Sequence, residues 1–215
     1  MQTLCFFLNV PAVLLLYVAA AMVLVPDFHG ISVVLGLPYD FFSSGMDYMV
    51  FGRWLLVTAI PILVNGLLLE RGSRIGVFIK IRGRQREDFC RKTAAACIEN
   101  HAVWCCFLTL CLAFTKGIFT AAEAFLPLQT NALLWESILA VLYYRGKASA
   151  SSGWITILIL GIFCLVGLHV PSLSHLLPPF WGMLCRNSGT QYGTRIALNL
   201  AASAIVLACL REREE

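Results

Sequence analysis

The chain has 215 residues, of which 59% are hydrophobic and only 13% charged, and its mean hydropathy is +0.80. Soluble domains carry about 25% charged residues, and a soluble domain of this size would need more polar surface than this composition supplies. The composition therefore excludes an ordinary soluble domain. It predicts one all-α domain, residues 1–215, that crosses a lipid bilayer several times.

The first apolar segment, residues 4–25, is long enough to span a hydrocarbon core of about 30 Å at about 1.5 Å of helix per residue. The first basic residue of the chain is Arg53. A cleavable signal peptide would begin with a positively charged region, so we expect this segment to be retained as a membrane helix.

Five further apolar segments follow, so the sequence predicts six spans: 4–25, 54–69, 101–119, 128–144, 154–170 and 194–210. Several of them lie at the short end of the spanning range of about 17 to 25 residues, and the third and fourth could instead pair as a re-entrant hairpin. Trp54, Trp104 and Trp154 stand at or near the start of a segment. Indole rings prefer the membrane interface, so their positions favour full spans.

Most of the 16 Lys and Arg residues lie in three places on one side of the predicted spans: residues 71–99, the connection after the fourth segment, and the C-terminal tail. Cytoplasmic loops of membrane proteins carry an excess of Lys and Arg. The distribution therefore predicts that residues 71–99 and both termini are cytoplasmic, and an even number of spans agrees with this.

The basic segment 71–99 is the predicted partner-binding site. Gly72, Ser73, Gly76 and Gly83 are expected to break its first half, and residues 85–98 are predicted to form a helix. The charge could serve only to orient the chain, or it could bind anionic lipid at about 1 kcal/mol per basic residue. Acidic residues among the cations favour a docking surface for a cytoplasmic protein. The residues assigned to that surface are Arg74, Lys80, Arg82, Arg84, Arg86, Glu87, Asp88, Arg91 and Lys92.

Glu136 stands near the middle of the fourth apolar segment. An ionisable group at that depth costs about 2.5–3.5 kcal/mol on insertion scales, and such groups usually face the bundle interior and have a function. We therefore expect Glu136 to face protein. A neutral carboxyl bonded to Asn131 or Ser137, or a shift of the span that places Glu136 nearer the surface, would also explain it.

Signatures of catalysis and of cofactor binding are missing. The nine cysteines form no CxxC pair and most lie in apolar segments, where a free thiol behaves as a small hydrophobe. His101, His169 and His175 show no metal-ligand spacing, and no HExxH motif, nucleophile elbow or phosphate-binding loop occurs. The sequence predicts no cofactor, no metal, no enzymatic activity and no nucleic-acid partner. If ATP drives this protein, another chain must bind it.

Three segments resemble ABC-2-type permease subunits of ABC transporters, in particular the small six-span permeases of bacteriocin-immunity and peptide-antibiotic exporters. They are LLLERGSRIGVFIKIRGRQREDFCRK after the second segment, HVPSLSHLLPPFWGML before the last, and the end of the chain, IVLACLREREE. The resemblance covers most of the chain but rests on no invariant motif. The chain departs from the family in starting without an amphipathic cytoplasmic helix, which would fit an accessory subunit.

This resemblance implies a bacterial plasma-membrane exporter subunit that works with a separate ATPase and with a second permease copy or a paralogue. Its substrate would be hydrophobic or amphiphilic, such as a peptide antibiotic. The resemblance also implies that residues 74–92 contact the ATPase and that residues 172–183 help to close the exit. The alternative is a membrane interaction, assembly or immunity protein that transports nothing.

The predicted topology can be tested with an impermeant thiol reagent on single cysteines in a cysteine-free background. Cysteines at Asp40 and Ser174 should react in intact cells, whereas cysteines at Arg84, Ala148 and the C-terminus should react only after lysis. Labelling at Arg84 in intact cells would reverse the orientation.

Overall fold

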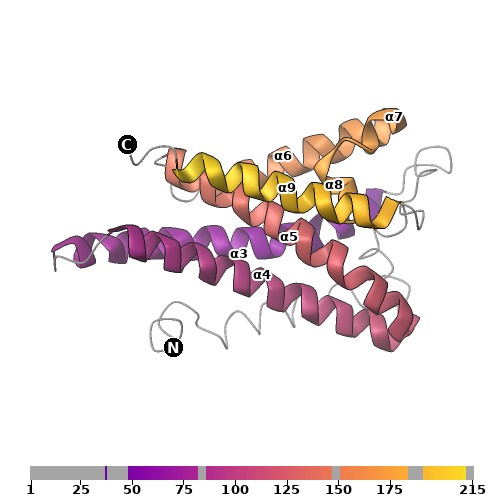
Figure 1. Cartoon of the computed structure of the whole chain (residues 1–215), viewed down its shortest axis with the longest axis horizontal. Helices are drawn as coiled ribbons and strands as arrows, with labels where there is room; N and C mark the ends of the chain where they lie inside the picture. The colour runs from indigo at the N-terminus through magenta and orange to yellow at the C-terminus, as the bar shows by residue number, and fades with distance from the viewer. Residues whose placement is uncertain (1–36, 38–47, 82–85, 147–150, 184–190, 212–215) are drawn as a thin grey trace.

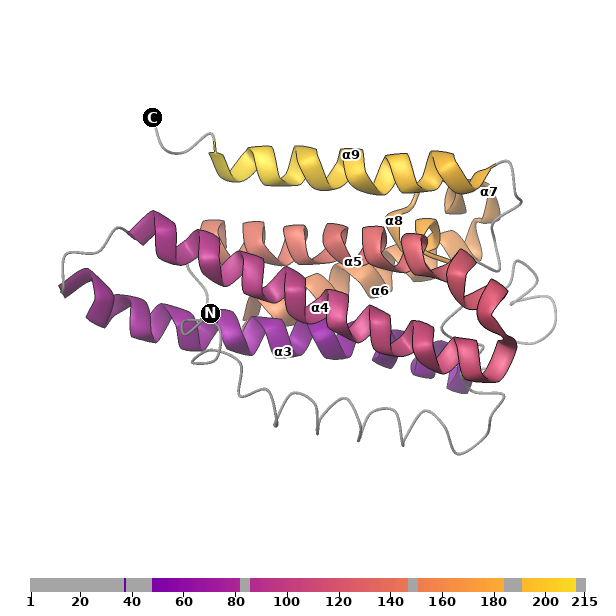
Figure 2. The same cartoon turned by 60° about the horizontal axis from the view of Figure 1, so that its bottom comes forward.

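The computed structural model describes residues 37, 48–81, 86–146, 151–183 and 191–211, and every regular element within these ranges is a helix. The first predicted span, residues 4–25, lies outside the described residues. The five long helices run along the longest axis of the molecule (Figure 1), and Figure 2 shows the same bundle from another side. In chain order the elements are α3 (Tyr48–Ile81), α4 (Arg86–Lys116), α5 (Ile118–Gly146), α6 (Ser151–His169), α7 (Pro171–Ser174), α8 (Pro178–Trp181) and α9 (Tyr192–Arg211).

Four of these helices contain a stretch that is long and apolar enough to cross a membrane. The stretches are Val50–Glu70, Ala95–Lys116, Ile118–Tyr144 and Ser151–His169. The apolar part of α9, Tyr192–Ala208, is shorter. These helices cover the second to sixth predicted segments, so the described chain is an all-helical protein with four candidate membrane spans.

The boundary between the third and fourth predicted segments is wrong. A break after residue 119 and a connection up to residue 128 were expected, but Gly117 alone separates α4 from α5, with φ of 95°. This left-handed conformation is readily adopted by glycine, which has no Cβ. The apolar residues on both sides continue as helix, which makes α4 and α5 an antiparallel pair with a one-residue turn (Figure 2).

The expected break in the basic segment is also wrong for the glycines that the structure describes. The helix α3 continues through Gly72, Ser73 and Gly76 to Ile81. A glycine costs about 1 kcal/mol in a helix interior, which a helix this long tolerates. The predicted helix 85–98 is present as the first part of α4, which runs on without interruption into the third segment. Both helices thus extend beyond their candidate spans, by about 16 Å for α3 at about 1.5 Å per residue.

The helix ends fall into two groups at opposite ends of the bundle. The end of α3 and the start of α4 lie at one end, with the end of α5, the start of α6 and the end of α9. The α4–α5 turn lies with α7 and α8 at the other end (Figure 1). The distribution of Lys and Arg predicted the same grouping of these helix ends on one side of the membrane. Which end faces the cytoplasm stays a prediction.

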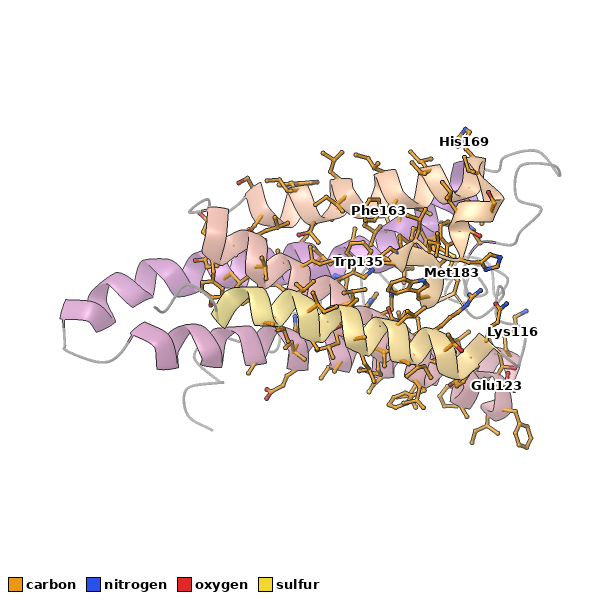
Figure 3. All side chains as sticks on the ribbon, turned by 45° about the horizontal axis from the view of Figure 1, so that its top comes forward. Lys116, Glu123, Trp135, Phe163, His169 and Met183 are labelled. Carbon is orange, nitrogen blue, oxygen red and sulfur yellow. The ribbon has the colours of Figure 1, made fainter. Side chains whose placement is uncertain are left out.

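The segment that holds α7 and α8 packs into the bundle. Phe180 is 1% exposed, and its ring lies so close to Gly167 of α6 that a Cβ there would be 2.1 Å from it. Met183 follows α8 and shares a hydrophobic cluster with Trp135 of α5 (Figure 3). Ser174 is itself buried, so the exposed Ser172 is the better labelling site in this segment.

Two prolines lie inside the long helices, and each leaves a carbonyl oxygen without its helical hydrogen bond. Pro61 of α3 has no N–H for the oxygen of Val57, and the indole nitrogen of Trp104 donates to that oxygen at 3.0 Å. Pro127 of α5 likewise frees the oxygen of Glu123, and the hydroxyl of Tyr192 donates to it at 2.9 Å. These two bonds attach α4 to α3 and α9 to α5.

Trp104→Phe should lower the free energy of unfolding by about 1–3 kcal/mol, because it keeps the ring but leaves the buried Val57 oxygen without a donor. Trp154→Phe is the matched control, since Trp154 is 64% exposed on α6. The measurement is denaturant-induced unfolding in mixed micelles. Equal effects of the two substitutions would show that the Trp104 bond contributes nothing.

Candidate functional site

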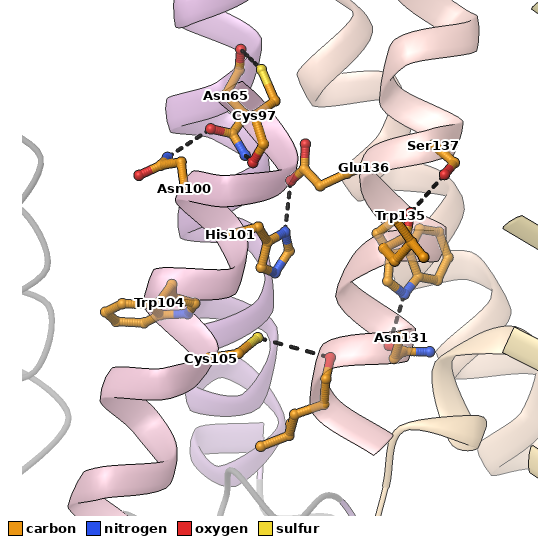
Figure 4. Close-up of polar contacts among 12 residues, drawn as sticks. Asn65, Cys97, Asn100, His101, Trp104, Cys105, Asn131, Trp135, Glu136 and Ser137 are labelled. Carbon is orange, nitrogen blue, oxygen red and sulfur yellow. Dashed lines mark hydrogen bonds and ion pairs between the residues drawn. The ribbon is translucent and has the colours of Figure 1, made fainter. Parts of the chain in front are cut away.

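Among the described residues, a histidine and a glutamate lie in close contact inside the bundle. Nδ1 of His101 on α4 lies 2.6 Å from Oε1 of Glu136 on α5 (Figure 4). His101 is 4% exposed and Glu136 is 2% exposed. Oε2 of Glu136 is buried and is the one buried side-chain oxygen or nitrogen of the described residues without a hydrogen-bond partner. Glu136 therefore lies inside the bundle and points toward α4.

A group of amides joins α3 to α4 beside this pair. The side-chain nitrogen of Asn65 donates to the backbone oxygen of Cys97 at 2.9 Å, and that of Asn100 donates to Oδ1 of Asn65 at 2.7 Å. The Cys97 thiol points to the backbone oxygen of Asn65 at 3.9 Å. Asn65 and Asn100 are buried, so each amide finds its partner within the protein (Figure 4).

A second group of amides joins α5 to α8 and α9. The side-chain nitrogen of Asn131 lies 2.9 Å from the oxygen of Pro178 and 3.1 Å from Oδ1 of Asn199, and it donates to both. Oδ1 of Asn131 accepts from the Trp135 indole at 3.0 Å. Ser137 donates to the backbone of its own helix, at Leu133. The hydrogen-bond partner of Glu136 is therefore His101, and neither Asn131 nor Ser137.

A cavity of about 40 Å³ lies next to His101. A buried water needs about 10–15 Å³ of such volume, so the cavity has room for about three waters. Glu136 does not line it, and His101 stands between the two. The lining residues are Trp54, Val57, Thr58, His101, Trp104, Cys105, Leu108, Leu128, Asn131, Ala132, Trp135, Pro179, Gly182 and Met183.

The structure keeps the two predicted groups of site residues apart. Arg74 and Lys80 lie in the extension of α3, and Arg86, Glu87, Asp88, Arg91 and Lys92 lie in the extension of α4. Arg82 and Arg84 fall outside the described residues. Lys92, the nearest of them along α4, precedes His101 by about 14 Å of helix at about 1.5 Å per residue. The basic extensions and the His101–Glu136 pair are therefore separate candidate sites.

The role of His101 was missed, although a signal for it exists. A carboxyl inside an apolar span requires a polar partner, and the third predicted segment holds only two basic side chains, His101 and Lys116. The choice between them depends on how α4 and α5 are aligned. That alignment depends on the turn at Gly117, which the predicted boundaries misplaced.

Comparison with known proteins identifies no relative. No family model, no curated protein and no solved structure matches this chain. Within the described residues, no group of three or more His, Cys, Asp or Glu side chains is arranged to hold a metal ion. The structure thus defines an all-helical chain with four candidate membrane spans and an ionisable pair in its interior.

His101→Leu should lower the free energy of unfolding by about 3–5 kcal/mol, because it leaves the Glu136 carboxylate buried without a partner. The double substitution His101→Leu and Glu136→Leu should recover most of this loss, since it removes both polar groups. Unfolding in mixed micelles measures the three variants.

Glu99→Gln is the control for these substitutions, because Glu99 lies on α4 close to His101 but is exposed. It should change stability by less than about 0.5 kcal/mol. If the double variant were no more stable than His101→Leu, the loss would come from packing and not from the unpaired carboxylate.

Proposed function

We propose that this chain is a membrane permease subunit of a bacterial exporter, driven by a separate ATPase. It would move a hydrophobic or amphiphilic substrate, such as a peptide antibiotic, across or out of the plasma membrane. The resemblance of three segments to ABC-2-type permeases suggests this function. The helical extensions of α3 and α4 are the structural observation that supports it best.

Both halves of the basic segment are helical and continuous with a candidate span. The part of α3 after Glu70 and the part of α4 before Ala95 lie outside the apolar stretches, at the end of the bundle where the two helices join (Figure 1). A loop that only orients a chain in a membrane needs charge but no fixed shape. Two helical extensions that continue into the spans can pass a displacement of a bound ATPase to them, which favours the docking role.

The packing of α7 and α8 suggests how the opposite end is closed. Arg195 of α9 donates to the backbone oxygen of Phe180 at 3.0 Å, and Asn131 of α5 donates to that of Pro178. The carbonyls of this segment are thus held by side chains of two long helices. Residues 172–183 would close the exit in the resting state, as the resemblance implies.

A second permease copy is part of this proposal. The cavity beside His101 has a volume of about 40 Å³, which is far too small for a peptide. Side chains such as Leu158 of α6 and Ile205 of α9 are exposed on the bundle. The substrate pathway would therefore form between two copies, or between this chain and a paralogue.

Reversing the charge of Arg82, Arg84 and Arg86 to Glu should abolish capture of the ATPase and substrate-stimulated ATP hydrolysis in nanodiscs. Like charges across an interface cost several kcal/mol, and a loss of about 3 kcal/mol weakens binding more than a hundredfold. Insertion should persist, because other basic residues remain on that side of the membrane.

Arg145→Glu with Lys147→Glu is the control, because it reverses charge in the other predicted cytoplasmic connection and should leave capture intact. If the triple variant still binds and stimulates the ATPase, the basic extensions serve only for orientation. If the unmodified chain captures no ATPase, the permease function falls and a membrane interaction or immunity protein replaces it.

A further inference from the structure

A buried ion pair is a poor device for stability alone, because the cost of removing two charges from water can exceed their attraction. Ionisable residues inside membrane spans are rare and usually mark ion or proton paths. We propose that His101 and Glu136 form a proton-binding site inside the bundle, which exchanges its proton with water in the adjacent cavity through Nε2 of His101. The proposal goes beyond the exporter function and does not depend on an ATPase.

The geometry gives the two ring nitrogens of His101 different neighbours. Nδ1 is engaged with Oε1 of Glu136 at 2.6 Å. The other nitrogen lies on the side of Cys105 (Figure 4), and His101 and Cys105 both line the cavity. Glu136 does not line it. Of the two residues of the pair, His101 is the one that lines the cavity, so we assign proton entry to its ring, at the nitrogen that Glu136 leaves free.

Uptake of one proton changes the charge of the pair without breaking its hydrogen bond. With a neutral ring that carries its hydrogen on Nδ1, the pair has the charge of the Glu136 carboxylate, −1. A hydronium ion in the cavity gives its proton to Nε2 and leaves as water, and the resulting imidazolium makes the pair neutral overall. Because the pair is buried, a change of one charge unit there has a larger electrostatic effect than the same change at the surface.

The unpartnered Oε2 of Glu136 supports exchange over a permanent ion pair. Its residue is 2% exposed and the atom has no hydrogen bond in the described structure. The nearby amides of Asn65 and Asn100 are oriented toward other acceptors. A contact built only for stability would satisfy both carboxylate oxygens. The free oxygen is a place for a transient donor when His101 is neutral.

Two thiols of α4, those of Cys97 and Cys105, interact with the pair. They point to the backbone oxygens of Asn65 and Leu128. On α3, Arg53 and Glu70 stand near the two ends of the candidate span. On α9, Arg195 binds Phe180 and Gln191. Further described ionisable groups on α4, α5 and α6 are Glu99, Cys106, Cys111, Lys116, Glu123, Tyr143, Tyr144, Cys164 and His169.

The test is the protonation state of His101, read from its ring-nitrogen chemical shifts by NMR on the full chain in nanodiscs between pH 5 and pH 11. His29, His169 and His175 are replaced by Gln so that one histidine remains. We expect His101 to change reversibly between the doubly protonated and the neutral ring while helical content stays constant. In Glu136→Gln the doubly protonated form should be lost over this range, because the neutral amide no longer stabilises it.

A second measurement tests entry through the cavity. Ala132→Leu fills cavity space on α5, and we expect it to slow exchange of the His101 proton with water at least tenfold. Thr58→Val serves alongside it, because it removes a polar group from the lining with little change in volume. A ring that stays doubly protonated throughout the pH range in the folded protein would make the pair a permanent ion pair and overturn the proposal. So would identical profiles in wild type and Glu136→Gln.

Discussion

The arrangement of these helices depends on hydrogen bonding in an interior that holds little water. In an apolar bundle every polar backbone group must find a partner within the protein, and an unpaired one costs several kcal/mol. Pro61 frees a buried carbonyl oxygen of α3, and Trp104 of α4 supplies the missing donor. Pro127 frees the oxygen of Glu123 at an exposed position, where Tyr192 of α9 donates to it. The prolines thus do more than perturb their own helices. Each one also provides an acceptor for a side chain of the neighbouring helix.

The same constraint explains the composition of the bundle interior. Asn65, Asn100, Asn131 and Asn199 are buried, and each is hydrogen-bonded to another helix or to α8, so they join α3 to α4 and α5 to α9 without net charge. Between these two groups of amides lies the His101–Glu136 contact, which can carry charge. The amides join the helices without charge, whereas the ionisable pair is the contact for which we propose proton binding.

Local pattern was enough to predict the helical class, the approximate second to sixth apolar segments and the cost of a carboxyl at residue 136. It was not enough where neighbouring helices decide the outcome. Helix α3 continues through Gly72 and Gly76, whereas Gly117 alone forms the turn between α4 and α5. The helix propensity of glycine is the same at all three positions, so it does not predict which of them ends a helix. The partner of Glu136 depends on the alignment of α4 with α5, which hydrophobic periodicity does not contain.

The one-residue turn at Gly117 also has a consequence for biogenesis. Two antiparallel helices joined by a single residue stay side by side. We therefore expect α4 and α5 to enter the bilayer together, as one hairpin. Their facing side chains meet before either helix is fully surrounded by hydrocarbon. His101 would then accompany Glu136 across the interface, so that the carboxyl has its partner during insertion. The hairpin turn would thereby lower the insertion cost that α5 alone would face.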